Sequence, residues 1–441
     1  MILNTILTPF QKFVKIESFS GMLLFGATLV AMIWANSEYG DSYQALWQFD
    51  IGITGENFEF TKPLILWIND GLMAVFFFLI GLEIKRELLI GELNSVRKAT
   101  FPMFAALGGM IFPLVIFLVL NRSAETANGW GIPMATDIAF TLAILKILGN
   151  RVPLSLKIFL TAFAIVDDLG VVLVIALFYS SGIDWWLILY AMLPLALLFF
   201  LSHRGIYIKY LSISIAIIIW FLFLGSGIHP TIAGVLMALT IPIRQKIDME
   251  GFTENLINIA KNFSETTRDY LPILSKEQIE QMDDLEDLTT KFNSPLQHLE
   301  HGLHGWVAYF IMPVFALANA GVVFGTDMEL DNLLVLNIAV ALFAGKGVGV
   351  VLMSFLSIKL KIASLPNGMN YRHIIGVAIL AGVGFTMSIF VANLAFPGNS
   401  VFIDSSKVGI LIGSVVSGLV GFIILRSGGS QTVPPVSSKS D

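Results

Sequence analysis

Two adjacent aspartates, Asp167 and Asp168, lie near the middle of an apolar stretch that runs from about 156 to 179. As a helix, these roughly 24 residues would extend about 36 Å, which is long enough to cross a bilayer core of about 30 Å. A charged side chain at that depth costs about 2.5–3.5 kcal/mol even on the lenient insertion scale. Two such groups therefore need compensation, and their oxygens suit a hard cation or a proton.

Two further ionisable side chains are expected at the same depth in other apolar stretches. Asp137 follows Thr136 and Pro133, and Lys346 lies midway along a later stretch. Proline has no backbone N–H, so Pro133 and the polar pair after it predict a break in their helix. Three Asp and one Lys at one depth indicate a functional site more than isolated packing residues.

A second interrupted helix is predicted near the end of the chain. The apolar stretch at 374–396 contains the glycines Gly376, Gly382 and Gly384. Broken spans expose half-helix ends whose partial charges point into the protein. A carboxylate such as Asp137 would neutralise facing N-termini, and an ammonium such as Lys346 would neutralise facing C-termini.

The composition is typical of a polytopic helical membrane protein. Of 441 residues, 56% are hydrophobic and 13% are charged, whereas soluble domains carry about 25% charged residues. The apolar runs are continuous rather than alternating, which excludes a membrane β-barrel. Cysteine is absent, which excludes disulfides and thiol chemistry. We expect no nucleic-acid partner and no resident cofactor.

The expected fold class is an all-α polytopic membrane protein with about twelve transmembrane helices. The spans are expected near 18–36, 64–83, 99–120, 132–148, 156–179, 185–201, 206–224, 230–243, 305–324, 333–357, 374–396 and 407–425. The broken fourth and eleventh spans occupy corresponding places in two sets of three. This placement predicts inverted repeats with two broken, crossing helices around a midplane site.

The distribution of basic residues predicts the orientation. One set of short loops holds most of the Lys and Arg residues, and the opposite set holds only Lys62, Arg122 and Lys407. By the positive-inside rule, both termini are cytoplasmic. The predicted organisation is a cytoplasmic segment at 1–17, spans at 18–243, an acidic cytoplasmic loop at 244–304, spans at 305–425 and a disordered tail at 426–441. No cleavable signal peptide is evident.

Two extramembrane segments carry their own patterns. Residues 46–60 alternate apolar and polar about Thr54-Gly55-Glu56, which predicts an outer β-hairpin, although a solvated loop stays open. The stretch from Asp248 to Glu300 holds twelve acidic and four basic residues. Two amphipathic helices are expected there, and Ser275 with Gln278 predicts a capping box. This segment is either a solvated helical hairpin or a sensor and docking element.

The aspartate pair suggests an exchange mechanism. Adjacent helix positions differ by about 100°, so Asp167 and Asp168 face different directions. One can line a water-filled cavity while the other pairs with a cation such as Lys346, and Thr136 can add a hydroxyl. A carboxylate that holds either a proton or a metal ion, and that is exposed alternately to each side, exchanges the two.

An enzymatic function is not expected. Intramembrane aspartyl proteases use aspartates on separate helices, one of them in a Gly-x-Gly-Asp motif, and that motif is absent. A channel or a receptor would not need both broken helices and an exchangeable carboxylate pair. A sodium-coupled symporter of an organic solute and a non-transporting sodium sensor remain as alternatives.

Several long strings in this sequence resemble the NhaA-type bacterial sodium/proton antiporters, over about 15–425. The matching strings are ATDIAF at 135–140, AIVDDLG at 164–170, GK at 345–346, GVGFTMSIF at 382–390, WIND at 67–70, GLEIKREL at 81–88 and LEHGLH at 299–304. The resemblance implies a multi-pass protein of the bacterial inner membrane that forms a homodimer through the outer hairpin. It also implies electrogenic export of Na⁺ and Li⁺ in exchange for H⁺.

The resemblance also assigns roles to individual residues. Asp167 and Asp168 are implied as the sodium- and proton-binding pair, with Asp168 as the direct ligand. Lys346 is implied as the salt-bridge partner of Asp167, and Asp137 with Thr136 at the helix crossing. The residues implied in the pH response are Glu83, Lys85, Arg86, Glu87, His229, Glu300 and His301.

Overall fold

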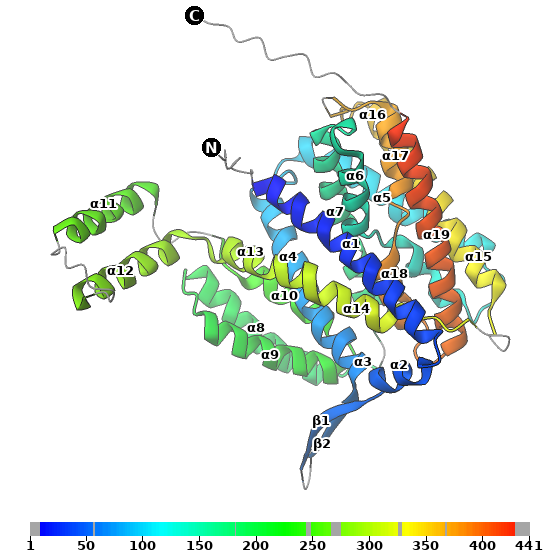
Figure 1. Cartoon of the computed structure of the whole chain (residues 1–441), viewed down its shortest axis with the longest axis horizontal. Helices are drawn as coiled ribbons and strands as arrows, with labels where there is room; N and C mark the ends of the chain where they lie inside the picture. Colours follow the sequence, from blue (N-terminus) through cyan, green and yellow to red (C-terminus); the bar gives the residue numbers. More distant parts are fainter. Residues whose placement is uncertain are drawn as a thin grey trace, which may run out of the picture.

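The computed structural model describes residues 9–55, 58–180, 182–243, 248–265, 275–324, 329–366 and 368–427, and most of them are helical (Figure 1). The helices of the first half are α1 (Pro9–Ala35), α2 (Gly40–Trp47), α3 (Leu64–Leu66), α4 (Met73–Leu89), α5 (Val96–Leu120), α6 (Ile138–Leu148), α7 (Leu154–Phe178), α8 (Trp185–His203), α9 (Lys209–Ser226) and α10 (Thr231–Thr240). Those of the second half are α11 (Met249–Glu265), α12 (Lys276–Phe292), α13 (Pro295–Trp306), α14 (Met312–Asn319), α15 (Asn332–Val340), α16 (Lys346–Lys359), α17 (Tyr371–Leu380), α18 (Phe385–Ala395) and α19 (Ser400–Arg426).

Short irregular helical segments interrupt several of these helices. The π-helical turns are η1 (Trp67–Leu72), η4 (Val307–Ile311) and η5 (Ala341–Gly345), and the 3₁₀ segments are η2 (Ala127–Met134) and η3 (Gly149–Arg151). Such π-helical turns are frequent at functional sites. The turn η5 ends one residue before Lys346 and joins α15 to α16.

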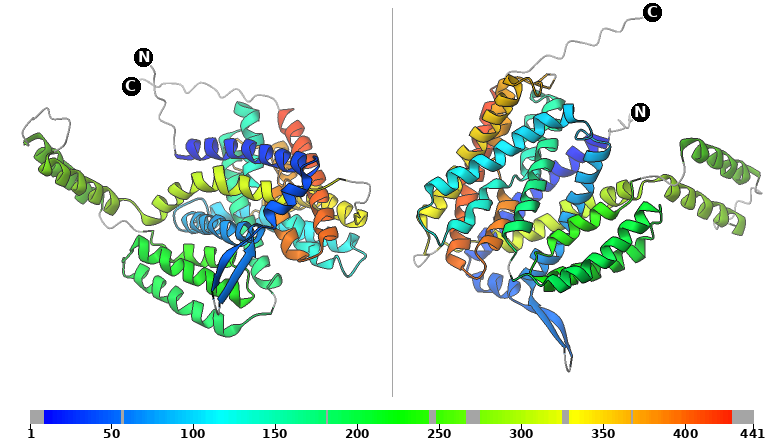
Figure 2. Two further views of the ribbon diagram at one scale, coloured as in Figure 1. Left: turned by 60° about the horizontal axis from the view of Figure 1, so that its bottom comes forward. Right: turned by 180° about the vertical axis from the view of Figure 1, so that it is seen from behind.

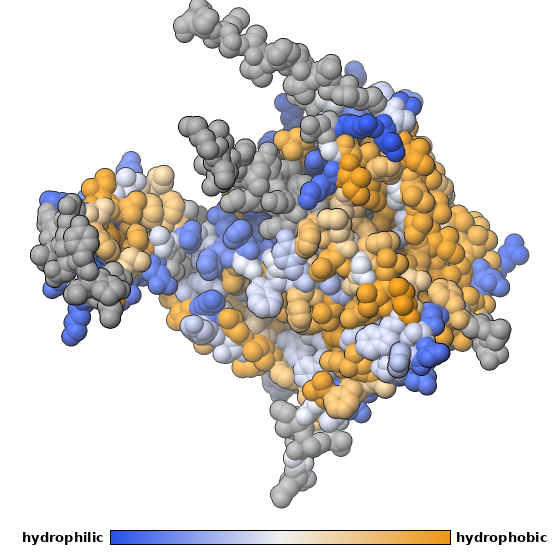
Figure 3. Space-filling model, viewed as in Figure 1, coloured by the Kyte–Doolittle hydropathy of each residue, from blue (hydrophilic) through white to orange (hydrophobic). Residues whose placement is uncertain are grey.

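The helices confirm a multi-pass membrane protein. Within the described residues, nine helical segments are long and apolar enough to span a bilayer, and the number rises to eleven if each of two bent pairs is one span. The apolar helix α10 has only 10 residues, so the count of twelve stays a prediction. Apolar side chains such as Leu419 and Ile423 of α19 are exposed. Figure 3 shows a broad apolar surface over the helices of the bundle.

An antiparallel hairpin of β1 (Asp50–Gly55) and β2 (Phe58–Pro63) projects from one end of the bundle (Figures 1 and 2). The expected start at residue 46 is wrong, because Leu46 and Trp47 end helix α2 and the ring of Trp47 is buried. Of the predicted turn, Glu56 lies outside the described residues.

The acidic segment contains the two expected helices, α11 and α12, which project away from the bundle (Figures 1 and 2). Ser275 caps α12 in a capping box with Gln278, and Phe252 stacks on Phe292 with 4.1 Å between ring centroids. The expected end of this segment at 304 is wrong. Helix α13 begins at Pro295, where proline suits the first helical position, and continues through η4 into α14.

Both predicted interruptions are present. The segment η2 ends at Met134, the next residues are extended, and α6 begins at Ile138. Helices α17 and α18 are bent by 44° at a four-residue break. A Cβ at Gly384 would lie 2.8 Å from the carbonyl oxygen of Ala135 and 2.3 Å from Ser388 Oγ. Glycine at this position therefore lets the two breaks lie against each other.

Glycines also set the spacing of the helices that surround these breaks. A Cβ at Gly349 of α16 would lie 2.2 Å from the carbonyl oxygen of Gly108 in α5. A Cβ at Gly234 of α10 would lie 2.3 Å from the carbonyl oxygen of Ala74 in α4. These backbones touch directly, as small residues allow in membrane helices.

Replacing Gly234 by leucine should therefore force α10 away from α4 and lower the thermal unfolding midpoint in detergent by several degrees. Overpacking of a close contact costs about 1–3 kcal/mol. The matched control is Gly26→Leu, because a Cβ at Gly26 has no heavy atom within 4 Å. Fluorescence-detected size-exclusion chromatography after heating measures both, and equal midpoints for the two variants would contradict the close contact.

Candidate functional site

The centre of the site is a buried ion pair between α7 and α16. Lys346 Nζ lies 2.7 Å from Asp167 Oδ2, and both side chains are fully buried. Lys346 Nζ also donates a hydrogen bond to Thr136 Oγ1. A charge in a membrane interior is tolerated when it is paired and hydrogen-bonded in this way.

Thr136 connects this ion pair to the end of a broken helix. Its hydroxyl donates to the carbonyl oxygen of Ala381 at 3.1 Å, directly after the last residue of α17. The C-terminal end of a helix carries partial negative charge, which favours a nearby cation. Because Thr136 hydrogen-bonds both to Lys346 and to this helix end, the positive charge of the ammonium compensates the partial negative charge there.

Asp137 occupies the opposite electrostatic position. Its Oδ1 accepts from the backbone N–H of Phe140 at 3.2 Å and caps the N-terminus of α6. Its Oδ2 accepts from the N–H and the hydroxyl of Thr386, at 3.1 and 2.5 Å, at the N-terminus of α18. The backbone N–H of Asp137 donates to the carbonyl oxygen of Val383 at 2.7 Å. One carboxylate therefore serves the N-termini of both broken spans.

Asp168 differs from its neighbour. It is only 3% exposed, and within the described chain its Oδ1 has no hydrogen-bond partner. It lines a cavity of about 40 Å³, which is large enough for a few water molecules. The cavity wall comprises Ser20, Phe76, Leu79, Ile80, Glu83, Thr136, Asp137, Ile138, Ala139, Asp168, His304, Val307, Ala308, Met312, Thr386 and Met387.

This arrangement can bind a small cation or a proton at Asp168. Both oxygens of Asp137 accept hydrogen bonds, and Asp167 is paired with Lys346. Asp168 lines the cavity and its Oδ1 has no hydrogen-bond partner within the described chain, and carboxylate oxygen is a ligand that hard cations prefer. The adjacent aspartates thus have two different environments on one helix.

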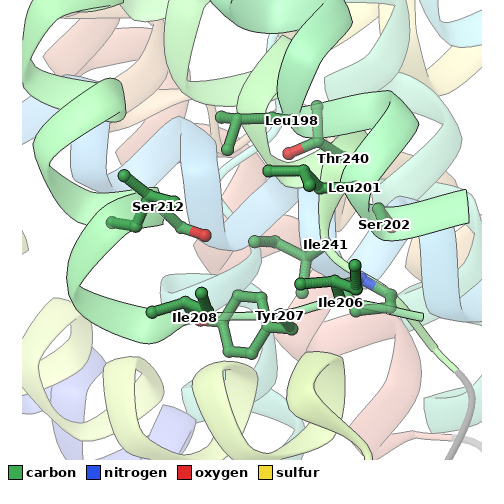
Figure 4. Close-up of a pocket in the computed structure, with 11 residues that line it drawn as sticks. Leu198, Leu201, Ser202, Ile206, Tyr207, Ile208, Ser212, Thr240 and Ile241 are labelled. Carbon is green, nitrogen blue, oxygen red and sulfur yellow. The ribbon is translucent and has the colours of Figure 1, made fainter. Parts of the chain in front are cut away.

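A second pocket, shown in Figure 4, lies away from the aspartates. It is formed by the ends of α8, α9 and α10 and the loops beside them, and most of its labelled side chains are apolar, with Tyr207 among them. Its volume is about 10 Å³, room for one water at most, and it shares no residue with the Asp168 cavity. The Asp168 cavity is therefore the candidate ion site.

The residues that the sequence assigned to a pH response fall into separate groups. Glu83 lines the Asp168 cavity, and its Oε1 lies 3.7 Å from Nδ1 of His304. Arg86 donates from Nε to both oxygens of Glu300 at 2.9 and 3.0 Å, and its Nη1 lies 2.7 Å from Glu87 Oε1. These groups lie where α4 meets α13.

Three of the assigned residues lie apart from these pairs. Lys85 Nζ donates to the carbonyl oxygens of Leu239 and Ile241 at 2.7 and 2.5 Å and so caps the end of α10. His301 is exposed. His229 lies between α9 and α10, beside Asp70, which precedes Glu83 by thirteen residues or about 20 Å of helix.

Burial lowers the pKa of His229 to about 4, and the charge of Lys62 adds to this effect. Its Nδ1 lies 2.8 Å from Thr231 Oγ1, and its Nε2 lies 3.6 Å from Asp70 Oδ1. The imidazole is therefore neutral at neutral pH. Its titration lies well below the pH range in which an unperturbed histidine titrates.

Three cavity residues were missed as site residues. His304 and Thr386 stood inside strings that marked the family resemblance, but they were not selected. Ser20 of α1 also lines the cavity. His304 is buried and His301 is exposed, but they lie three positions apart on neighbouring parts of one helix face, so their spacing in the sequence does not distinguish them.

Asp137→Ala should lower the thermal unfolding midpoint more than Asp137→Asn. Alanine removes the charge and every acceptor at two helix N-termini, whereas asparagine keeps one acceptor oxygen. We expect a loss of about 1–3 kcal/mol for alanine. Thermal unfolding in detergent checks the order, and an alanine variant as stable as the parent would contradict the capping role.

His229 should make stability depend on acid. Its pKa is lower in the folded chain than the unfolded value of about 6.5, so the unfolded state binds the proton first as the pH falls. The contribution of the neutral His229 to the free energy of unfolding is therefore fully present above about pH 6.5. At pH 5 the free energy of unfolding is lower by about 2 kcal/mol. His229→Gln should reduce the difference in unfolding midpoint between pH 8 and pH 5, and the exposed His298→Gln should not.

Comparisons with known proteins identify the family of this chain. A family model described as Na⁺/H⁺ antiporter 1 matches residues 11–425. The chain is 46% identical over 430 residues to the Na(+)/H(+) antiporter NhaA of Oleidesulfovibrio alaskensis, covering 96% of this chain and 95% of the relative. It is 44% identical to the NhaA proteins of Bacteroides thetaiotaomicron, over 96% of this chain and 98% of that protein, and of Helicobacter pylori, over 96% of each. The chain therefore belongs to the Na⁺/H⁺ antiporter 1 family.

Proposed function

We propose that this protein exports Na⁺, and also Li⁺, in exchange for H⁺, with Asp168 as the exchangeable ligand. The observation that carries the proposal is the environment of Asp168. Asp168 lines the cavity and its Oδ1 has no hydrogen-bond partner among the described residues, whereas both oxygens of Asp137 accept hydrogen bonds and Oδ2 of Asp167 pairs with Lys346. A family named for sodium/proton antiport supports the same ions.

Competition for one group produces the exchange. A cation on the carboxylate of Asp168 excludes a proton from the same oxygens, and a proton excludes the cation. We infer that Asp167 takes a second proton when the cation has left, so that two H⁺ enter for each Na⁺ that leaves. One net charge then moves per cycle, which makes the exchange electrogenic.

The broken spans suit alternating access. Their helix ends are compensated by Asp137 and by the Lys346–Thr136 pair, so no continuous helix needs to pass through the site. Spans of this kind place a site near the midplane of the membrane. A modest movement of α18 relative to α4 and α14 would then expose the same cavity to the other side.

The proposal extends to regulation, assembly and location. The ion pairs of Arg86 with Glu87 and Glu300, and the Glu83–His304 contact, lie next to the cavity and suit pH regulation. An isolated two-stranded hairpin is marginal in water, so β1–β2 suits pairing with a second copy in a homodimer. The basic loops favour insertion into the bacterial inner membrane with both termini cytoplasmic.

Asp168→Asn should abolish sodium/proton exchange while the protein still inserts and folds. The amide does not bind a proton at neutral pH, and it has no negative charge with which to bind sodium. The measurement is sodium-dependent dequenching of a ΔpH dye in everted vesicles. The matched control is Asp404→Asn on α19, where the aspartate is paired with Lys407 at 3.5 Å and lies outside the cavity. This control should retain exchange.

Full exchange by Asp168→Asn would overturn the assignment of Asp168. If the unmodified protein bound sodium without moving protons, it would be a sensor. If it took up a labelled organic solute with sodium, it would be a symporter. The same vesicle preparation therefore separates the three functions.

A further inference from the structure

Three buried or half-buried asparagines from three different spans form one hydrogen-bonded cluster. Asn319 exchanges two hydrogen bonds with Asn69, at 3.2 and 2.9 Å. Asn393 donates from Nδ2 to Asn319 Oδ1 at 2.8 Å, and Asn319 Nδ2 also donates to the carbonyl oxygen of Phe315 at 3.0 Å. All four hydrogen-bonding positions of the Asn319 amide are thus used.

Side-chain hydrogen bonds join two separate sets of elements in the bundle. Thr136, Asp137, Lys346 and Ser388 join η2, α6, α7, α16, α17 and α18, which we name the site group. Other bonds join α2, η1, α4, α9, α10, α13 and α14, which we name the flanking group. Asn393 belongs to α18 in the site group, and its partner Asn319 belongs to α14 in the flanking group.

Helix α18 is therefore held at both ends, but by different groups. At its N-terminus, Thr386 bonds to Asp137 within the site group. Seven residues later, about two turns along the same helix face, Asn393 bonds to the flanking group. Between them, the ring of Phe390 lies 6.2 Å from that of Phe315 and 5.6 Å from that of Phe77.

The cluster lies at the opposite end of the flanking helices from the cavity residues Glu83 and His304. On the second span, Asn69 precedes Glu83 by fourteen residues, which corresponds to about 21 Å of helix. On the ninth span, Asn319 follows His304 by fifteen residues. Glu83 and His304 line the cavity, whereas the asparagines and the three phenylalanine rings lie beyond it.

We propose that Asn393 is a positioning residue that latches α18 to α14 and keeps the Asp168 cavity closed toward the outer side. The proposal rests on the proposed exchange, because alternating access requires the site group to move against the flanking group. The bond to Asn319 must break in that movement, whereas the bonds to Asp137 can persist. Asn393 thus contributes to the equilibrium between the two states and not to ion binding.

The test uses two variants. Asn393→Leu replaces the amide by an apolar side chain of similar size, and Asn393→Ala removes the amide and leaves only the Cβ methyl group. The chain has no cysteine, so Met387→Cys in the cavity wall provides a single reporter thiol. Its reaction with a membrane-impermeant cationic thiosulfonate is measured in right-side-out and everted vesicles. The matched control is Asn337→Leu on α15, because Asn337 is buried and neither of its amide atoms has a hydrogen-bond partner within the described chain.

Loss of the latch should raise the outer-side labelling rate at least threefold and lower the inner-side rate. The apparent KM for sodium at the inner side should at least double, because it rises as the fraction of inward-open protein falls. Asn337→Leu should change neither quantity. Unchanged labelling on both sides in folded Asn393→Leu and Asn393→Ala proteins would overturn the latch, whereas absence of exchange in the unmodified protein would contradict the proposed function instead.

Discussion

The structure depends on the electrostatic compensation of helix ends that lie in a medium without water. Breaking two membrane helices leaves backbone N–H and C=O groups that must be satisfied inside the protein. Asp137 satisfies two N-termini with one carboxylate, and Lys346 reaches the end of α17 through the hydroxyl of Thr136. Because these charges are already committed to the fold, Asp168 is the carboxylate that we propose as the exchangeable ligand.

Glycine makes this compensation geometrically feasible. The two breaks can share Asp137 only if their backbones touch, and Gly384 allows the approach to Ala135. Similarly, Gly349 brings α16 onto α5, and the π-helical turn η5 then places Lys346 opposite Asp167. A larger residue at either glycine would separate a charge from the helix end or carboxylate that it serves.

The sequence predicted the membrane class, both interruptions and the burial of Asp137, Asp167, Asp168 and Lys346, because these features depend on local properties. Charge, apolar length and proline or glycine content can each be read within one segment. The boundaries of the outer hairpin and of the acidic segment were misjudged for a related reason. Polar residues such as Glu300 resemble a loop in isolation, whereas α13 buries one of its faces against the bundle.

The contacts between distant segments could not be predicted in this way. The choice between His301 and His304 depends on which face of α13 meets α4, and the asparagine cluster depends on the approach of three spans. An asparagine in an apolar stretch signals a buried amide but does not identify its partner. Asn69 stood in a recognised string, yet only its pairing with Asn319 gives it a structural role.

The two ends of α18 impose different demands on an exchange cycle. The bonds from Thr386 to Asp137 compensate a helix N-terminus, so breaking them would leave a charge and a helix end unpaired in an apolar environment. The bond from Asn393 to Asn319 joins neutral groups, and Asn319 Oδ1 keeps a donor from Asn69 when Asn393 withdraws. Breaking the second contact is therefore much less costly than breaking the first. A cycle that moves α18 as part of the site group, with the asparagine contact yielding, keeps the compensated helix ends intact in both states.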